Sequence, residues 1–144
     1  MATVNDILGR KGDLVVTVPA SATALDAAQV MNEHGIGGVV VLEDGEMVGV
    51  FTERDILRRV VASHKDPART RLRDVLTYPI VTVRPDTSLE ACRGLITQKR
   101  IRHIPVVGDG GLCGIITSGD ILAYQMEEQK DTIDYLSSYV FDLR

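Results

Sequence analysis

This chain of 144 residues is poor in aromatic side chains and in cysteine. It has no tryptophan and two phenylalanines, so its hydrophobic core must be built mainly from Val, Ile, Leu and Ala. Such side chains suit strands that pack against helices. The two cysteines, Cys92 and Cys113, show no CxxC spacing and have no neighbouring histidine. We therefore interpret them as reduced thiols that pack inside a cytoplasmic protein, and not as a disulfide or a metal site.

The sequence also shows no membrane-spanning run, no secretory signal and no excess of basic residues. No apolar run approaches the roughly 20 residues that a membrane-spanning helix needs. The N-terminus has no basic segment followed by an apolar one, so we expect neither a membrane partner nor a secretory signal. Sixteen basic residues face twenty acidic ones, which gives a net charge of -4. This balance opposes nucleic-acid binding, because that function needs a basic field.

The chain contains an internal repeat. The segment GVFTERD at residues 49–55 recurs as GIITSGD at residues 114–120, which is an offset of 65. Around the first helix of each copy, Thr23 matches Thr87 at an offset of 64. We therefore expect two copies of one unit, with one residue inserted near the first helix.

Each copy has the same order of signals: a β-branched run, a hydroxyl residue that opens a helix, two short strands joined by a Gly-Asp turn, and a second helix. In the first copy the expected strands cover residues 15–18, 39–42 and 47–52, and the helices begin after Thr23 and at residue 53. In the second copy the expected strands cover residues 80–83, 104–107 and 112–117, and the helices begin after Thr87 and at residue 118.

These elements predict an α/β (α+β) fold of two βαββα units. A unit of about 55 residues buries only a limited core by itself, so we expect the units to pack sheet against sheet with pseudo-two-fold symmetry and to leave clefts between them. The expected divisions are residues 1–66 for the first repeat with its N-terminal lead-in, 67–124 for the second repeat, and 125–144 for a C-terminal amphipathic helix.

The GIITSGD segment has the parts of a ligand site. Thr117 ends a strand and Asp120 lies in the first turn of the next helix, where free backbone N–H groups attract an anion such as phosphate. The carboxylate can accept two hydrogen bonds from a ribose diol, and Gly114 leaves room for a flat ring or another backbone. Arg102 and His103 can bring positive charge to the phosphate. Together these parts fit a nucleoside monophosphate.

A purely structural interpretation stands beside this one. A threonine followed by an acid three residues later is also a capping box, which stabilises a helix by about 1 kcal/mol. A duplication would copy a cap as readily as a ligand site. Arg54 is then a solvated helix residue, and His103 is a packing residue at a strand edge. Both interpretations remain open at this point.

The two halves resemble a tandem pair of cystathionine-β-synthase-type (CBS) domains. The resemblance covers residues 4–123, and it is carried by IRHIPVV at residues 101–107 and by the twice-repeated pattern of Gly, two apolar residues, Thr, any two residues and Asp. It implies a Bateman module, in which two βαββα units bind adenosine-containing ligands in the clefts between them and regulate another protein.

The resemblance also implies roles for individual residues. Asp55 and Asp120 would hold ribose hydroxyls, and Thr52 and Thr117 would lie at the ribose or phosphate. Adenine would lie between residues of the first strands, namely Ile80, Val81 and Thr82 in one half and Val16, Thr17 and Val18 in the other. Because the halves differ in charge, we expect Arg54 to supply the cation in one cleft and Arg102 or His103 in the other.

The expected function is a nucleotide-binding regulatory module that acts on an unidentified partner protein and is not an enzyme. AMP, ADP, ATP and NAD all fit an Asp that binds a ribose diol. S-adenosylmethionine fits less well, because its sulfonium is positive. No HExxH, GxSxG or Walker pattern appears, which disfavours an enzyme. A structural or protein-interaction module with vestigial clefts remains the alternative.

The C-terminal residues carry a separate signal. Ile133, Leu136, Val140 and Leu143 follow a 3-4-3 spacing, which predicts a further amphipathic helix. This helix either covers an edge of the module or packs against a partner chain. Modules of the resembled family commonly dimerise through their helices, so we expect a homodimer.

Overall fold

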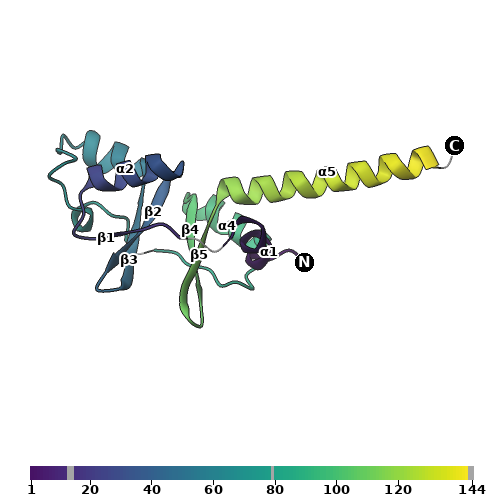
Figure 1. Cartoon of the computed structure of the whole chain (residues 1–144), viewed down its shortest axis with the longest axis horizontal. Helices are drawn as coiled ribbons and strands as arrows, with labels where there is room; N and C mark the ends of the chain where they lie inside the picture. The colour runs from purple at the N-terminus through teal and green to yellow at the C-terminus, as the bar shows by residue number, and fades with distance from the viewer. Residues whose placement is uncertain (13–14, 79, 143–144) are drawn as a thin grey trace.

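Two small sheets organise the fold, one in each repeat (Figure 1). The computed structural model describes residues 1–12, 15–78 and 80–142. The first sheet contains β1 (Thr17–Pro19), β2 (Gly38–Glu43) and β3 (Glu46–Thr52), and the second contains β4 (His103–Gly108) and β5 (Gly111–Thr117). Strand β1 pairs with β2 in parallel, whereas β2–β3 and β4–β5 are antiparallel hairpins. The predicted fold class, two mixed α/β repeats with a C-terminal helix, is confirmed.

The strand predicted at residues 80–83 does not form. Val83 makes an isolated parallel bridge to Val106, and its neighbours 80–82 lie outside any strand. In the first repeat the Val40 N–H donates to the Val16 carbonyl at 3.2 Å. The residue at the position of Val40 in the second repeat is Pro105, which has no N–H to donate. One proline therefore shortens the second sheet by a strand.

The helices follow the expected order. They are α1 (Val4–Lys11), α2 (Ala24–His34), α3 (Glu53–Asp55), which continues as the π-helical segment η1 (Ile56–Val61), the short 3₁₀ helix η2 (Leu72–Asp74), α4 (Leu89–Lys99) and α5 (Ser118–Asp142). The predicted cap Thr23 is correct, since its hydroxyl accepts a hydrogen bond from the Asp26 N–H at 3.1 Å.

The corresponding cap of α4 is Ser88, so the prediction of Thr87 is wrong. Ser88 lies 65 residues after Thr23, which means that no residue is inserted between the repeats here. An offset of 64 matches Leu25 with Leu89, and these two positions differ in burial. Leu25 is 39% exposed, whereas Ala24 and Leu89, 65 residues apart, share the buried position at the start of the helix.

The C-terminal segment is not a separate helix. Helix α5 runs without a break from Ser118 to Asp142 and projects away from the rest of the molecule (Figure 1). No glycine or proline follows Gly119 in this helix, so nothing in the sequence ends it earlier. Ile133 and Leu136 lie on α5 and are exposed. The side chain of Val140, and Leu143 altogether, lie outside the described part of the chain.

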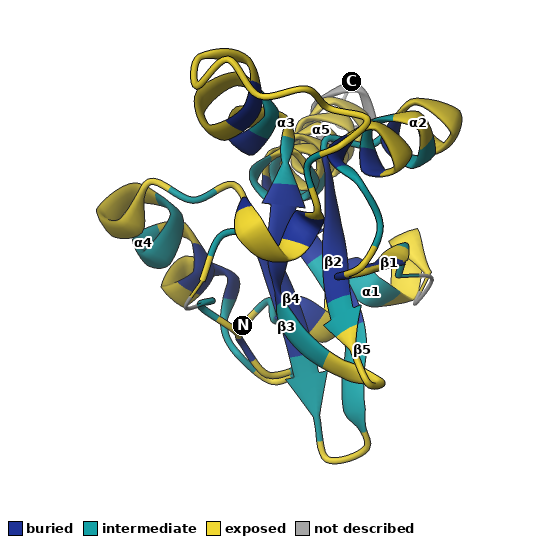
Figure 2. Cartoon of the chain, turned by 90° about the vertical axis from the view of Figure 1, so that its left-hand side faces the viewer, coloured by how far each residue is buried: buried dark blue, intermediate teal, exposed yellow. Residues whose placement is uncertain are grey.

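Each repeat has its own hydrophobic core, and each core is completed by a segment that precedes the other repeat. Leu72 and Val75, which lead into the second repeat, are buried in the first core. Val4 and Ile7 of α1, which we grouped with the first repeat, are buried in the second core. Buried segments of β2, β3 and β4 accordingly lie between the helices in the middle of the molecule (Figure 2). Cys92 also lies in the second core, as predicted.

Two glycines let these crossing segments come close. A Cβ at Gly49 would lie 2.6 Å from the Thr77 carbonyl oxygen, and a Cβ at Gly114 would lie 2.7 Å from Cδ2 of Leu8. The space that we expected Gly114 to leave for a ring or a backbone is therefore filled by the side chain of Leu8. We call the repeated pattern GhhTxxD, where h is an apolar residue and x is any residue. The glycine of each copy, Gly49 or Gly114, lets a segment that leads into the other repeat pack closely against the strand.

Each core contains residues from the segment that precedes the other repeat, which we call the exchange of segments. A substitution in such a segment should therefore destabilise the core of the repeat into which its side chain packs. Ile7→Ala should cost about 2–4 kcal/mol in unfolding free energy, because it leaves a cavity in the second core. In hydrogen exchange, this variant should lose amide protection in β4 and β5. Leu72→Ala is the matched variant and should lose protection in β2 and β3. The opposite pattern would contradict the exchange of segments.

Candidate functional site

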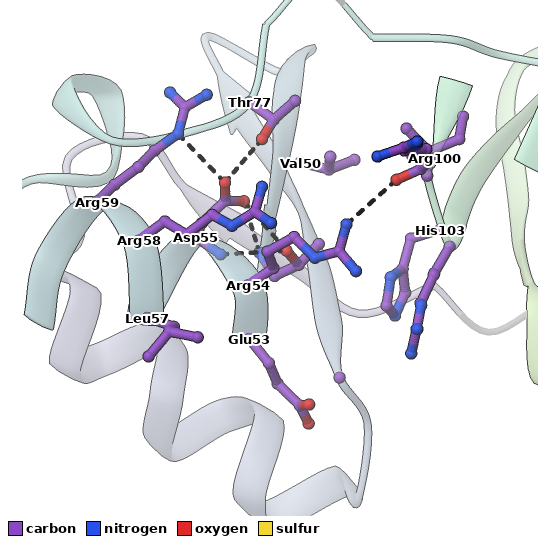
Figure 3. Close-up of a pocket in the computed structure, with 14 residues that line it drawn as sticks. Val50, Glu53, Arg54, Asp55, Leu57, Arg58, Arg59, Thr77, Arg100 and His103 are labelled. Atoms are coloured by element: carbon purple, nitrogen blue, oxygen red, sulfur yellow. Dashed lines mark hydrogen bonds and ion pairs between the residues drawn. The ribbon is translucent and has the colours of Figure 1, made fainter. Parts of the chain in front are cut away.

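A cavity of about 610 Å³ lies between the two repeats (Figure 3). The first repeat contributes the end of β3, helix α3 and the start of η1, and the second contributes the segment between α4 and β4. The lining residues that carry the argument are Thr52, Glu53, Arg54, Asp55, Arg58, Arg59, Thr77, Arg100, Arg102 and His103. The volume lies in the range of small-molecule sites.

Asp55 is the most enclosed charged group of this cavity. Its side chain is 8% exposed, and its Oδ1 accepts a hydrogen bond from the Thr77 hydroxyl at 2.8 Å and lies 3.4 Å from Nε of Arg59. Its Oδ2 accepts from the backbone N–H of Thr52 at 2.9 Å. The Thr52 hydroxyl in turn accepts from the Asp55 N–H, which completes a capping box. The structural interpretation of this motif is thus correct, and the carboxylate is also held by a residue that leads into the second repeat.

Positive charge accumulates around this carboxylate. Five arginines line the cavity: Arg54, Arg58 and Arg59 on one side, and Arg100 and Arg102 on the other. Arg54 spans the two repeats, because its Nη1 donates to the Arg100 carbonyl at 3.3 Å. Arg59 donates to the Leu76 carbonyl at 3.0 Å. Two carboxylates, Glu53 and Asp55, line the same cavity, so the guanidinium groups outnumber them and favour an anionic ligand.

Arg100 has an unusual backbone. It ends α4 with φ of 54°, in the left-handed region, whereas Gly35 ends α2 with φ of 62°. A residue with a Cβ costs about 1–2 kcal/mol in this conformation. Such strain concentrates at functional sites. The second repeat therefore carries an arginine at a position where glycine is the favoured residue.

His103 connects the repeats by packing against glycine. A Cβ at Gly38 would lie 3.0 Å from Cδ2 of His103, and one at Gly37 would lie 3.5 Å from its Nε2. Burial lowers the pKa of His103 below its usual value, and this outweighs the nearby carboxylate of Glu53, which raises it. The ring is therefore mainly neutral at pH 7.

The cavity combines residues that the sequence analysis assigned to different clefts. Thr52, Arg54 and Asp55 were expected together, and they are together. Arg102 and His103 were expected beside Thr117 and Asp120. His103 does pair with Thr117 in the β4–β5 hairpin, and the Ser118 N–H donates to the Arg102 carbonyl at 3.0 Å. Both residues also line the cavity of the first repeat. The reason is geometric: Gly37 and Gly38 leave an open space in the first repeat, and the ring of His103 occupies it.

The second copy of the motif has a different neighbour. Thr117 and Asp120 form a capping box with hydrogen bonds of 2.9 and 3.0 Å. The Nζ of Lys11, at the end of α1, lies 2.6 Å from Oδ2 of Asp120. The same ammonium donates to the Ile115 carbonyl at 2.9 Å. The carboxylate of Asp120 is therefore paired with a lysine of the same chain.

The residues that we expect to contact adenine do not line this cavity. None of residues 16–18 or 80–82 is among the described residues that line the cavity. Val18 is buried in the first core, and Thr17 and Thr82 are exposed. The apolar part of the lining comes instead from Val50, Leu57 and Ile101. The assignment of adenine to the first strands remains a prediction.

Several lining residues were missed at the level of sequence. Arg58 and Arg59 lie one helical turn after Arg54 and Asp55, and the i, i+4 spacing is a signal that would have found them. Thr77 and Arg100 gave no local signal, because they reach the cavity from other elements.

The chain belongs to the CBS domain family, since matches to that family cover residues 12–62 and 72–127. A curated relative, the mitochondrial CBS domain-containing protein CBSX3 of Arabidopsis thaliana, is 31% identical over 96% of this chain and 71% of its own length. The CBS-domain containing protein ATU1752 of Agrobacterium tumefaciens has a solved structure with a TM-score of 0.82, 34% identity, and coverage of 86% of this chain and 99% of that one.

A third similar protein is the hexameric CBS-CP12 protein of bloom-forming cyanobacteria, with a TM-score of 0.75 and 34% identity over 85% of this chain and 70% of that one. CBS-domain pair proteins are generally regulatory and often bind nucleotides. Within residues 1–12, 15–78 and 80–142, no three His, Cys, Asp or Glu side chains are placed to hold a metal ion. No helix in the described part of the chain is long and apolar enough to cross a membrane.

The depressed pKa of His103 predicts a pH effect on stability. The unfolded chain takes up this proton at about pH 6.5, whereas the folded chain resists it, so the contribution of His103 to stability is complete above that pH and is lost as the pH falls through the lower, folded pKa. Urea unfolding from about pH 8 to about pH 5 should show this loss in the wild type. The His103→Gln variant should show a smaller loss. Equal pH dependence of both proteins would contradict the assignment.

Proposed function

We propose that this chain is an adenine-nucleotide-binding regulatory module that holds its ligand in the cavity between the repeats. The observation that carries the proposal is the convergence of five arginines on one cavity beside a capped, buried carboxylate. Nucleotide phosphates are the common small-molecule anions that such a guanidinium cluster binds in bidentate fashion. CBS domains commonly bind adenosine ligands, which agrees with this choice.

We assign roles from the geometry of the lining. The arginines of η1 and of the segment before β4 take the phosphates. Thr52 and Asp55 lie next to the ribose, where the carboxylate has oxygen lone pairs to accept hydroxyl donors. Val50 and Ile101 offer apolar surface to the base. A positively charged sulfonium ligand such as S-adenosylmethionine is disfavoured by the same arginines. The proposed site supplies binding and no catalytic group.

A second candidate function is a protein-interaction module whose clefts hold no ligand. The exposed apolar side chains of α5 favour it. An interaction surface on α5 is also compatible with the first function, because a regulatory module must pass its signal to another surface. We propose that α5 forms this surface by pairing with α5 of a second copy.

The pairing rests on a heptad pattern along α5. Residues of α5 at alternating spacings of four and three are Leu122, Met126, Gln129, Ile133, Leu136 and Val140, and the same spacing continues in the sequence to Leu143. The four large apolar side chains of this seam that the structure describes, Leu122, Met126, Ile133 and Leu136, are all more than half exposed. A helix of 25 residues is about 37 Å long. A 3.5-residue repeat that is apolar at every position except Gln129 fits a second α5 helix in a coiled coil.

The ligand proposal predicts saturable binding by the purified, ligand-free protein. AMP, ADP or ATP should raise the melting temperature, and the rise should increase with nucleotide concentration. S-adenosylmethionine should have little effect. The Arg58→Ala variant should bind more weakly at unchanged melting temperature of the free protein, because Arg58 is exposed. Calorimetric titration measures the affinity. If AMP, ADP, ATP and NAD all leave the melting curve unchanged, the proposal fails.

The Arg100→Gly variant should lower nucleotide affinity without lowering the stability of the free protein. Arg100→Gly removes a cation but relieves a left-handed backbone, so the free protein should be as stable as the wild type or more stable, by up to about 1 kcal/mol. Nucleotide affinity should fall about tenfold, because one charge-assisted contact is lost. Lys99→Ala is the control and removes the neighbouring charge without changing the backbone. Unchanged affinity in Arg100→Gly would remove Arg100 from the site.

The pairing of α5 predicts a dimer that depends on the seam. Combining Ile133→Ser with Leu136→Ser should give monomers in light scattering, since two apolar seam positions become polar. The control combines Asp131→Ser with Asp134→Ser, which changes the same helix off the seam. A seam variant that keeps the mass of the wild-type assembly would contradict pairing through α5.

A further inference from the structure

The two GhhTxxD motifs differ in what touches their carboxylates. Oδ1 of Asp55 accepts a hydrogen bond from the neutral hydroxyl of Thr77 and also lies 3.4 Å from Nε of Arg59, which is on the same helical segment. Oδ2 of Asp120 accepts a hydrogen bond from the ammonium of Lys11, which comes from α1. Thr77 and Lys11 hold matching places, because each lies at the end of a segment that crosses to the other repeat. The segment that crosses to the first repeat therefore ends in the neutral hydroxyl of Thr77, and the segment that crosses to the second repeat ends in the positive ammonium of Lys11.

The ammonium of Lys11 is fixed by two acceptors. It lies 2.6 Å from Oδ2 of Asp120 and 2.9 Å from the Ile115 carbonyl oxygen. The side chains of Lys11 and Asp120 are 30% and 25% exposed, so the pair is partly shielded from water. The Oδ2 atom also accepts the backbone N–H of Thr117 at 2.9 Å. A ribose hydroxyl that approached this oxygen would meet the ammonium first.

Helix α1 holds Lys11 in this place. Val4 and Ile7 are buried in the second core, and Leu8 packs on Gly114. Arg10 pairs with Glu127 and lies over the ring of Tyr124, with 4.7 Å from Cζ to the ring centroid. These contacts hold α1 against the second repeat. The packing of α1 therefore sets the backbone position of Lys11 beside Asp120.

We propose that Lys11 is an internal ligand of the second motif, which decides that a nucleotide occupies one cleft of the module and not both. This inference rests on the proposed function for the identity of the ligand. The ammonium takes the acceptor oxygen that a ribose diol needs and adds a positive charge where a hydroxyl would lie. In the first motif the crossing segment supplies the neutral hydroxyl of Thr77, and the cation that pairs with Asp55, Arg59, is one of the arginines that line the cavity. The first motif is therefore left as the nucleotide site.

The test is the number of nucleotides bound per chain, measured by equilibrium dialysis with radiolabelled AMP and ATP. The wild type should bind one, and Lys11→Met should bind two, because the carboxylate of Asp120 becomes free. Lys11→Arg should bind one, since it keeps the charge, and Lys130→Met is the surface control with one. A partly exposed ion pair contributes little to stability, so Lys11→Met should fold, and its melting curve checks this.

The remaining outcomes separate the two proposals. If the wild type and Lys11→Met both bind one nucleotide, or if the wild type binds two, the role of Lys11 is wrong and the proposed function stands. If the wild type binds none and Lys11→Met binds one, Lys11 blocks the second motif but the first cavity is not a nucleotide site. If neither protein binds, both proposals fail. Adding Asp120→Ala to Lys11→Met should return two bound nucleotides to one, and two remaining would overturn the inference.

Discussion

The rest of the structure depends on the exchange of segments between the two repeats. Neither repeat closes its core with its own residues alone, because Ile7 lies in the core of the second and Leu72 in the core of the first. The hydrophobic free energy of each core therefore includes the other repeat, and the repeats fold as one module. The exchange also brings the ends of the crossing segments to the two motif carboxylates, which is where the module departs from symmetry.

The asymmetry between the two repeats comes from a small number of residues. The ring of His103 fills the place that Gly38 leaves, and Thr77 and Lys11 face equivalent carboxylates with different charge. The arginines of η1 add to one side of a single cavity. A duplicated unit thus yields two similar helix starts with unlike surroundings. The electrostatic difference between them lies in the neighbours and not in the motifs themselves.

Helix α1 links the second motif to the projecting helix α5. Lys11 contacts Asp120 at the start of α5, and Arg10 contacts Glu127 two turns further along. A change at the second carboxylate would therefore act on the same short helix that braces α5. In a family whose members are generally regulatory, such a contact offers a physical path from the motif to the exposed seam.

The sequence by itself determined the repeat, the order of elements and the hydroxyl–carboxylate pairs at both helix starts, because these follow from local patterns that need no partner. It also pointed to Asp55, Thr52 and Arg54 as one group. Local matching failed at Thr87, because only burial shows that Ala24 and Leu89 are equivalent. It failed again at residues 80–83, because the missing N–H belongs to Pro105, a residue on the strand that would pair with them.

Tertiary structure alone decided which residues meet. The approach of Thr77 to Asp55 and of Lys11 to Asp120 spans residues that are far apart in the chain and depends on how the cores are completed. Arg102 and His103 stay beside Thr117 and Ser118 in the second repeat, and they also reach the cavity of the first repeat, where an open space at Gly37 and Gly38 receives the ring of His103. Charges act through distance in space, and no local pattern contains that distance.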